Sequence, residues 1–328
     1  MSSIPKNQRT AAVRIELDIP NTEGSPELFQ RGNGLFAVTS NMILKIQDPD
    51  VVDPERLNAD APWTQSILLP HGKTDPFVAR TILQSRQMAD IFLTAGSEEH
   101  RHFMDVSWEV LNSLVSIRMI RSRLELQIDE IATKINVDRD QYVDGMSPKP
   151  LPILNYYDIE FRSFVNEVRR VLTSISKLFK VLHNHEIPSG HFHKALIWVG
   201  EKHGQDCLLY QMLENDLNWI KVWIDIRIAI EHPKPNSFVE TLNFTLEPNR
   251  DIRLPTWRFV HPDYDMARPQ NLLDVFGICI ENILKFFEDL QVAMLDGKLP
   301  ASSKVCIFYV DERERELACP KRMILNRI

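Results

Sequence analysis

The chain has 328 residues and a formal net charge of −7, with 44% hydrophobic and 25% charged residues. These values are ordinary for a globular chain, and the length allows one large domain or two smaller ones with a sizeable core. The acidic balance argues against broad, non-specific binding to nucleic acid. Any contact with RNA would therefore need a local basic patch.

The cysteines and the hydrophobic pattern indicate a cytoplasmic protein. Cys207, Cys279, Cys306 and Cys319 are far apart and form no CxxC spacing, which favours a reduced compartment. The first ten residues contain no apolar signal core, and no run of about 18 apolar residues occurs in the chain. We therefore expect a soluble, cytoplasmic chain with no membrane partner.

The N-terminal part, residues 1–76, is predicted to be a β-containing and irregular region. Residues 12–18 alternate apolar and charged side chains, as a half-buried strand does, and residues 34–46 predict a second strand or a pair of strands. Residues 47–76 are rich in proline and aspartate and show no sustained period. We expect an irregular connection there.

Residues 77–328 are predicted to form a helical bundle. Apolar side chains recur every three or four positions, which is the period of an amphipathic helix. Asp75 and Pro76 are suitable capping residues for the first of these helices. The predicted helices cover residues 77–93, 103–135, 157–182, 193–199, 208–232 and 270–295.

Short β additions complete the prediction. Residues 240–246 and 252–260 flank a turn-forming segment, which predicts an inserted hairpin at about 240–260. Pro255 favours an edge position for the second of these strands. Residues 305–310 and 323–328 predict strands near the C-terminus. The predicted fold class is mainly α, an antiparallel helical bundle with small β additions at the N-terminus, an inserted β-hairpin and a C-terminal strand.

The helix at 208–232 carries the most informative pair of residues in the chain. Arg227 follows Trp223 by four residues, so a cation lies on or beside the face expected to be buried. Such a charge needs a partner or an anion. His232 falls where the helix must stop, because Pro233 disfavours helical geometry at the residue before it. The pair therefore lies at the C-terminal end of a helix.

The motif Arg227-Ile-Ala-Ile-Glu-His232, followed by proline at the end of a bundle helix, resembles the HEPN superfamily. The resemblance implies an all-helical bundle that is often dimeric. It also implies a metal-independent ribonuclease of a defence, toxin or abortive-infection system, with no cofactor. The expected partners are RNA, a second copy of the chain and, for a toxin, an antitoxin. The family commonly has a polar residue directly after the arginine, whereas this chain has Ile228, which keeps open a non-catalytic interaction or nucleotide-binding module.

The resemblance gives the two motif residues catalytic roles. A histidine that titrates near neutral pH can act as base or acid on the RNA, and an arginine can stabilise the charge of the phosphorane. In the family the residues of two protomers converge, so Arg227 and His232 would form a composite site across a dimer axis. Glu231 could orient His232, bind Arg227 or repel phosphate. Alternatively, Arg227 neutralises a carboxylate of a neighbouring helix and His232 caps its own helix.

A basic stripe follows one face of the predicted helix at 157–182. Arg162, Arg169, Arg170 and Lys177 are candidate substrate-binding residues, because cations along one helix face can follow a phosphate backbone. Such a run is more often a solvated face.

Histidines are concentrated in the segment 183–203. A metal site would use His183, His185, His191 and His193, since closely spaced imidazoles suit zinc or nickel. No cysteine, carboxylate pair or His-x3-His spacing completes a recognisable site, so we expect none of these residues to bind a metal.

Overall fold

The computed structural model describes residues 25–31, 34–58, 60–143, 149–296, 298 and 305–327. The chain is mainly α-helical, as the sequence predicts, with small antiparallel sheets. Its contacts define two compact units, the first comprising Met1–Trp108 and Gly297–Ile328 and the second Glu109–Asp296. The sequence predicts a boundary between residues 76 and 77. The contacts instead group residues 77–108 and 297–328 with the N-terminal part, in the first unit. The predicted strand at 12–18 lies outside the described residues.

The first unit contains a four-stranded antiparallel sheet in the order β1-β2-β3-β4 and a separate hairpin, β10-β11. The structure confirms the predicted strand pair at 34–46 and the two C-terminal strands. The Asp75 side chain caps the predicted helix by accepting from the Phe77 N–H at 2.9 Å. The elements are β1 (Glu27–Arg31), β2 (Gly34–Val38), β3 (Ile43–Gln47), α2 (Pro49–Val52), β4 (Thr64–Leu69), α3 (Pro76–Val78), the π-helix η1 (Ala79–Leu83), α4 (Gln84–Phe92), β10 (Val305–Tyr309), the 3-10 helix η2 (Glu312–Glu314) and β11 (Met323–Arg327).

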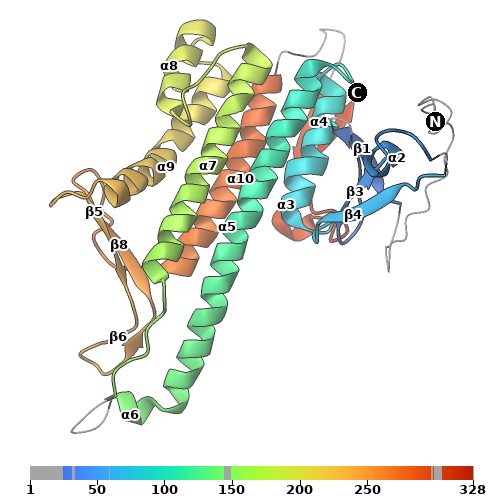
Figure 1. Ribbon diagram of the computed structural model, residues 1–328. Helices are drawn as coiled ribbons and strands as arrows, with labels where there is room; N and C mark the ends of the chain where they lie inside the picture. Colours follow the sequence, from blue (N-terminus) through green and yellow to red (C-terminus); the bar gives the residue numbers. More distant parts are fainter. Residues whose placement is uncertain are drawn as a thin grey trace. The chain divides into compact units, whose positions relative to one another are not determined.

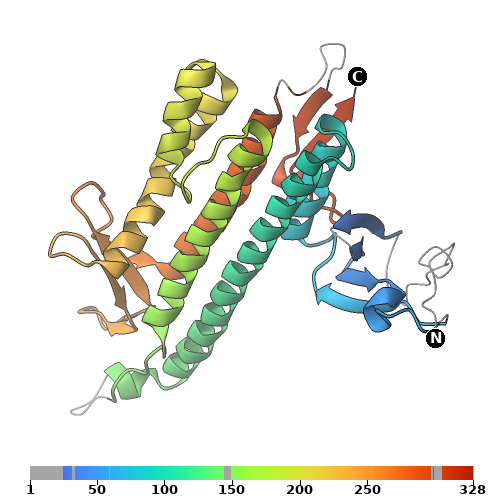
Figure 2. The same cartoon turned by 45° about the horizontal axis from the view of Figure 1, so that its top comes forward.

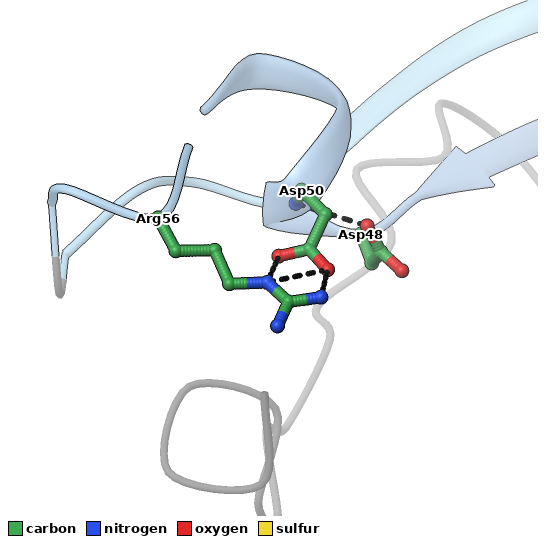
Figure 3. A network of polar contacts seen from close by, with 3 residues as sticks. All are labelled: Asp48, Asp50 and Arg56. Atoms are coloured by element: carbon green, nitrogen blue, oxygen red, sulfur yellow. Dashed lines mark hydrogen bonds and ion pairs between the residues drawn. The ribbon is translucent and has the colours of Figure 1, made fainter. Parts of the chain in front are cut away.

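The segment predicted to be irregular contains two ordered elements, α2 and β4 (Figure 1). Figure 3 shows how α2 is held: the Asp48 side chain accepts from the Asp50 N–H at 2.9 Å, and Arg56 Nη2 donates to Asp50 Oδ2 at 2.9 Å. Strand β4 is mostly exposed and pairs with β3. It shows no alternation of apolar and polar residues, which is why its sequence does not predict a strand.

The second unit is formed mainly by long helices. Helices α7, α9 and α10 pack against one another, and α8 packs against α9 (Figure 1). Phe164 of α7 stacks on Phe276 of α10 and contacts Trp223 of α9, so one aromatic cluster joins the three helices. The elements are α5 (Glu98–Val137), which begins in the first unit, α6 (Arg139–Val143), α7 (Tyr157–His183), α8 (Phe192–His203), α9 (Leu208–Glu231) and α10 (Leu272–Leu295).

Helix α5 lies alongside α7 (Figures 1 and 2). Lys177 Nζ lies 2.6 Å from Glu109 Oε2, and Arg123 Nη2 lies 2.6 Å from Glu160 Oε2. Because the earlier residue of α5 pairs with the later residue of α7, the two helices run antiparallel here. Of the helices that the structure describes, none is long and apolar enough to cross a membrane.

The predicted hairpin is present, but its second strand is not at an edge. Strand β8 lies between β5 and β9 in a three-stranded antiparallel sheet, and β6 pairs with β7. The prediction from Pro255 was wrong because this proline lies between β7 and β8, where no ladder hydrogen bond is needed from its nitrogen. The strands are β5 (Phe238–Leu242), β6 (Thr245–Leu246), β7 (Ile252–Arg253), β8 (Thr256–Val260) and β9 (Gln270–Asn271).

Candidate functional site

The C-terminal end of α9 positions both residues of the predicted motif. The helix ends where the sequence predicts: His232 is the C-cap residue, and its backbone N–H donates to the Ile228 carbonyl at 2.7 Å. Pro233 follows and prevents another helical turn. On an ideal helix five residues turn through about 140°, so Arg227 and His232 leave the helix on different sides. One chain therefore places the two side chains in two separate environments.

Arg227 is near enough to Arg169, one of the predicted substrate-binding residues, for their charges to interact. Arg227 Nη2 lies 2.7 Å from Glu231 Oε1, and the two side chains are 34% and 40% exposed. Burial lowers the pKa of the half-buried Arg169 of α7, and the charge of Arg227 lowers it further, whereas the charge of Glu231 raises it. The carboxylate that pairs with Arg227 therefore comes from its own helix, one turn on, and not from a neighbouring helix.

The loop before α8 closes over Arg169. Gly190 has a positive φ of 70°, and a Cβ atom added to it would lie 2.7 Å from Arg169 Nη1. Nη1 is buried and, within the described part of the chain, has no hydrogen-bond partner. His191 follows, and its pKa is lowered by burial and then by the charges of Arg169, His193 and Lys194. We call Arg169, Arg227, Glu231, Gly190 and His191 the arginine cluster.

His232 lies on the other side, in a cavity of about 200 Å³ that we call the histidine cavity. The end of α9 contributes one wall, and the segment before β5 and the segment after β8 contribute the rest. The lining residues include Asp225, Ile228, His232, Lys234, Ser237 and His261. His232 is exposed, so its imidazole is accessible to solvent and to a ligand.

Two contacts fix the polar groups of the histidine cavity. His261 Nδ1 accepts from the backbone N–H of Asp263 at 3.2 Å, so neutral His261 carries its proton on Nε2. The Tyr264 hydroxyl donates to Asp225 Oδ2 at 2.6 Å. The pKa of Tyr264 is raised by burial, by this hydrogen bond and by the charges of Asp225 and Asp263. The Asp225 carboxylate is thus already hydrogen-bonded.

The sequence did not identify His261, Lys234 or Tyr264. His261 and Tyr264 follow β8 and reach the end of α9 because the inserted strands fold back on that helix. Neither the spacing nor the periodicity of the sequence shows this approach. Lys234 was detectable in principle, because it lies between Pro233 and Pro235, two residues after the motif histidine.

The members of the predicted basic stripe have different surroundings. Lys177 pairs with Glu109 at 2.6 Å, and Arg170 pairs more loosely with Glu167 at 3.5 Å. Arg162 is exposed. Arg169 is the member of the stripe that the structure places at the motif, and the other three retain their substrate-binding role only as a prediction.

The histidine-rich segment forms a ring cluster around Trp198 of α8. His185 stacks on the indole at 4.3 Å between ring centroids, and the rings of His183 and His203 lie within 5.7 and 5.6 Å of it. His191 and His193 contact each other elsewhere, at 5.4 Å. Among the described residues, no group of three or more histidines, cysteines or carboxylates is placed to hold a metal ion.

The two sides of α9 can do different chemistry. The arginine cluster combines two guanidinium groups with one carboxylate, which suits the binding of an anion. The histidine cavity combines an accessible imidazole with a lysine and a second histidine, which suits proton transfer beside a bound phosphate. Comparisons with protein-family models, curated proteins and solved structures found no match for the chain. The function therefore has to be argued from these two groups of residues.

Proposed function

We propose that the chain is a metal-independent endoribonuclease of the HEPN type, acting as a homodimer in which the second unit is an antiparallel helical bundle. The observation that carries the proposal is the position of His232, exposed at the end of α9 in a cavity with Lys234 and His261. An imidazole in this setting can exchange protons with a ribose hydroxyl while neighbouring donors contact the phosphate.

The reaction is a transesterification within the RNA. His232 removes the proton of the 2′-hydroxyl, and the 2′-oxygen attacks the adjacent phosphorus. The bond from phosphorus to the 5′-oxygen breaks, and that oxygen takes up the proton that His232 removed, which gives a 5′-hydroxyl end and a 2′,3′-cyclic phosphate. Arg227 stabilises the negative charge that develops on the phosphorane oxygens.

The separation of the two motif residues supports a composite site. Arg227 pairs with Glu231, whereas His232 lines the histidine cavity, of which Arg227 is not a lining residue, so we infer that a single chain does not present both to one phosphate. In a two-fold dimer, Arg227 of one protomer can face His232 of its partner, and each protomer contributes one residue to each site. A dimer is then a condition of activity.

The proposal is tested by incubating the full chain with total RNA and tRNA in the presence of EDTA. We expect cleavage with 2′,3′-cyclic phosphate ends, reduced by about 10²- to 10⁴-fold in His232→Ala, because general acid–base catalysis contributes that much. Arg227→Ala should also lose cleavage. His102→Ala changes a histidine of the first unit whose side chain is 54% exposed, and it serves as the matched control. Unchanged cleavage by folded His232→Ala would disprove the assigned role.

A second candidate is a non-catalytic HEPN-fold module that binds a nucleotide or a partner protein. Two observations favour it: Arg227 is paired with Glu231, and the residue after the motif arginine is Ile228, which is 44% exposed and lines the histidine cavity. A well-folded dimer that cleaves none of these RNAs would support this candidate.

The proposed defence or toxin role has a separate test in cells. Expression of the wild-type chain should arrest growth, and expression of His232→Ala at the same level should not. Growth arrest by both proteins would separate toxicity from RNA cleavage. Relief of the arrest by a co-expressed neighbouring gene product would identify an antitoxin.

A further inference from the structure

We propose that the arginine cluster is a phosphate-binding site in which the guanidinium groups of Arg169 and Arg227 hold a phosphate group against the loop at Gly190. This inference goes beyond RNA cleavage, because it requires no contribution from His232 and holds equally for a non-catalytic protein. The site lies wholly in the second unit and joins α7, α9 and the loop before α8.

The first argument is the hydrogen-bonding of Arg169. A guanidinium group has five N–H donors and no acceptor, and a buried donor without a partner is costly. Nη1 of Arg169 is such a donor within the described residues. A phosphate oxygen is a strong acceptor that can approach a guanidinium in the plane of its donors. The loop covers Nη1, so a phosphate would bind the other N–H donors of Arg169 and offset the cost of its partly buried charge.

The second argument is the balance of charge. Arg169 and Arg227 carry two positive charges, and the carboxylate that acts on both is Glu231. Lys194 adds positive charge on the α8 side, since it, like Arg169, lowers the pKa of His191. The cluster is thus left with an excess of positive charge, partly screened from water. An anion removes this excess, and a phosphate brings oxygens for both arginines.

The third argument is the conformation of the loop. The positive φ of Gly190 lets the backbone turn next to Arg169. Because Gly190 has no side chain, Arg169 Nη1 can approach the loop closely: a Cβ atom added to Gly190 would lie only 2.7 Å from Nη1. Ser176 Oγ accepts from the Gly190 N–H at 3.3 Å and holds the loop to α7. The arrangement fixes the guanidinium of Arg169 before any ligand arrives.

The structure offers a matched pair of glycines for the test. Gly204, at the C-terminal end of α8, also has a positive φ, 85°, but a Cβ atom added there would have nothing within 4 Å. Gly190→Ala and Gly204→Ala both place an alanine at a positive φ and therefore both impose backbone strain. Only Gly190→Ala also displaces the guanidinium of Arg169.

The experiment titrates inorganic phosphate, AMP and a short oligodeoxynucleotide into the full-length protein and measures affinity by calorimetry. DNA lacks the 2′-hydroxyl and is not cleaved, so binding is measured without turnover. We expect at least one probe to bind, with affinity reduced about tenfold or more in Arg169→Gln, because charge-assisted hydrogen bonds to phosphate are lost. Gly190→Ala should weaken binding. Gly204→Ala and Arg139→Gln should bind as the wild type does, because Arg139 pairs with Asp251 at 2.8 Å in the second unit and belongs neither to the arginine cluster nor to the predicted basic stripe.

The outcomes separate this inference from the cleavage proposal. His232→Ala should bind phosphate normally even if it loses cleavage. Tighter binding of the oligonucleotide identifies a polynucleotide backbone as the source of the phosphate, and tighter binding of AMP or inorganic phosphate identifies a free phosphate. No binding of any probe, or equal affinity in Arg169→Gln and wild type, would overturn the inference. If Gly190→Ala does not fold, the comparison of phosphate affinity between Arg169→Gln and Arg139→Gln still tests the inference.

Discussion

The arginine cluster and the histidine cavity lie on different sides of the same helix end and are built in different ways. The arginine cluster forms where α7, α9 and the loop before α8 pack together, and its central side chain, Arg169, is half-buried. The histidine cavity forms where the inserted strands fold against α9, and His232 at its edge is exposed. Helix packing thus produces one environment and the insertion produces the other.

The difference matters for function because the two sides carry different chemical groups. Guanidinium groups are permanently charged and bind anions, so the arginine cluster provides positive charge for a phosphate. An imidazole can accept and donate a proton, so the histidine cavity provides a group for acid–base chemistry. Anion binding and proton transfer can therefore be altered separately by substitutions on opposite sides of α9.

The largest effect is expected from mixing two inactive variants. If Arg227 of one protomer acts with His232 of the other, Arg227→Ala mixed with His232→Ala forms heterodimers with one intact site of two. After subunit exchange at equal amounts, activity should recover to about a quarter of the wild-type value, because half of the dimers are mixed. Cleavage by the mixture, compared with each variant alone, is the measurement. No recovery in a mixture shown to contain heterodimers would exclude the composite site.

A smaller and opposite effect is expected from Glu231→Gln, which changes the arginine cluster. The substitution removes the carboxylate 2.7 Å from Arg227 and leaves both guanidinium groups free for an anion. Affinity for phosphate should rise several-fold at low salt, and the gain should shrink as salt is added. The free energy of unfolding should fall by less than about 1 kcal/mol, because the pair is partly exposed.

Glu167→Gln is the matched control for Glu231→Gln. Glu167 faces Arg170 at 3.5 Å, outside the arginine cluster, so its substitution should leave phosphate affinity unchanged. Weaker phosphate binding by Glu231→Gln would mean that Glu231 organises the site and does not compete with the anion.

The helices could be predicted from the sequence because their burial repeats with the helical period. Helix α9 buries Leu209, Met212, Ile220 and Trp223 on the face that the sequence indicates, and Pro233 marks its end. Strand β4 was missed because it is mostly exposed and shows no alternation. The edge position predicted from Pro255 was wrong because the sequence does not distinguish a proline just outside a strand from one inside it.

The candidate site was predictable only in part, for a related reason. The motif gave Arg227 and His232, and the cation-rich face of α7 gave Arg169 among other candidates. That Arg169, and not Lys177 or Arg162, approaches Arg227 depends on the packing of α7 against α9. His261 reaches α9 only through the fold of the inserted strands. Contacts between distant segments leave no periodic signal in a single sequence.

Tyr264→Phe should have a modest effect confined to the histidine cavity. Loss of the hydroxyl that donates to Asp225 should lower the free energy of unfolding by about 0.5 to 1.5 kcal/mol. The folded state raises the pKa of Tyr264 above its ordinary value of about 10, so its contribution is complete below pH 10 and is lost as pH rises further. Denaturant unfolding should therefore show that the free energies of unfolding of wild type and Tyr264→Phe differ less above pH 10 than at pH 8.

Tyr156→Phe is the control for Tyr264→Phe, because the side chain of Tyr156 is 74% exposed. It should leave stability unchanged at both pH values. If the free energy of unfolding differs between Tyr264→Phe and wild type by the same amount at pH 8 and above pH 10, ionisation of Tyr264 does not contribute to alkaline unfolding.

The smallest change in stability is expected from Ile228→Asn, on the histidine-cavity side. Ile228 is 44% exposed, so the substitution should change the free energy of unfolding by about 0.5 kcal/mol or less. It places a side-chain amide in the cavity beside His232, where it can donate to a phosphate oxygen. If the site is catalytic, cleavage should rise roughly two- to tenfold, the rate equivalent of one neutral hydrogen bond. A change in phosphate affinity at the arginine cluster without a change in cleavage would mean that the two sides of α9 are coupled in binding. Anion binding and proton transfer would then not be separate functions of the two sides.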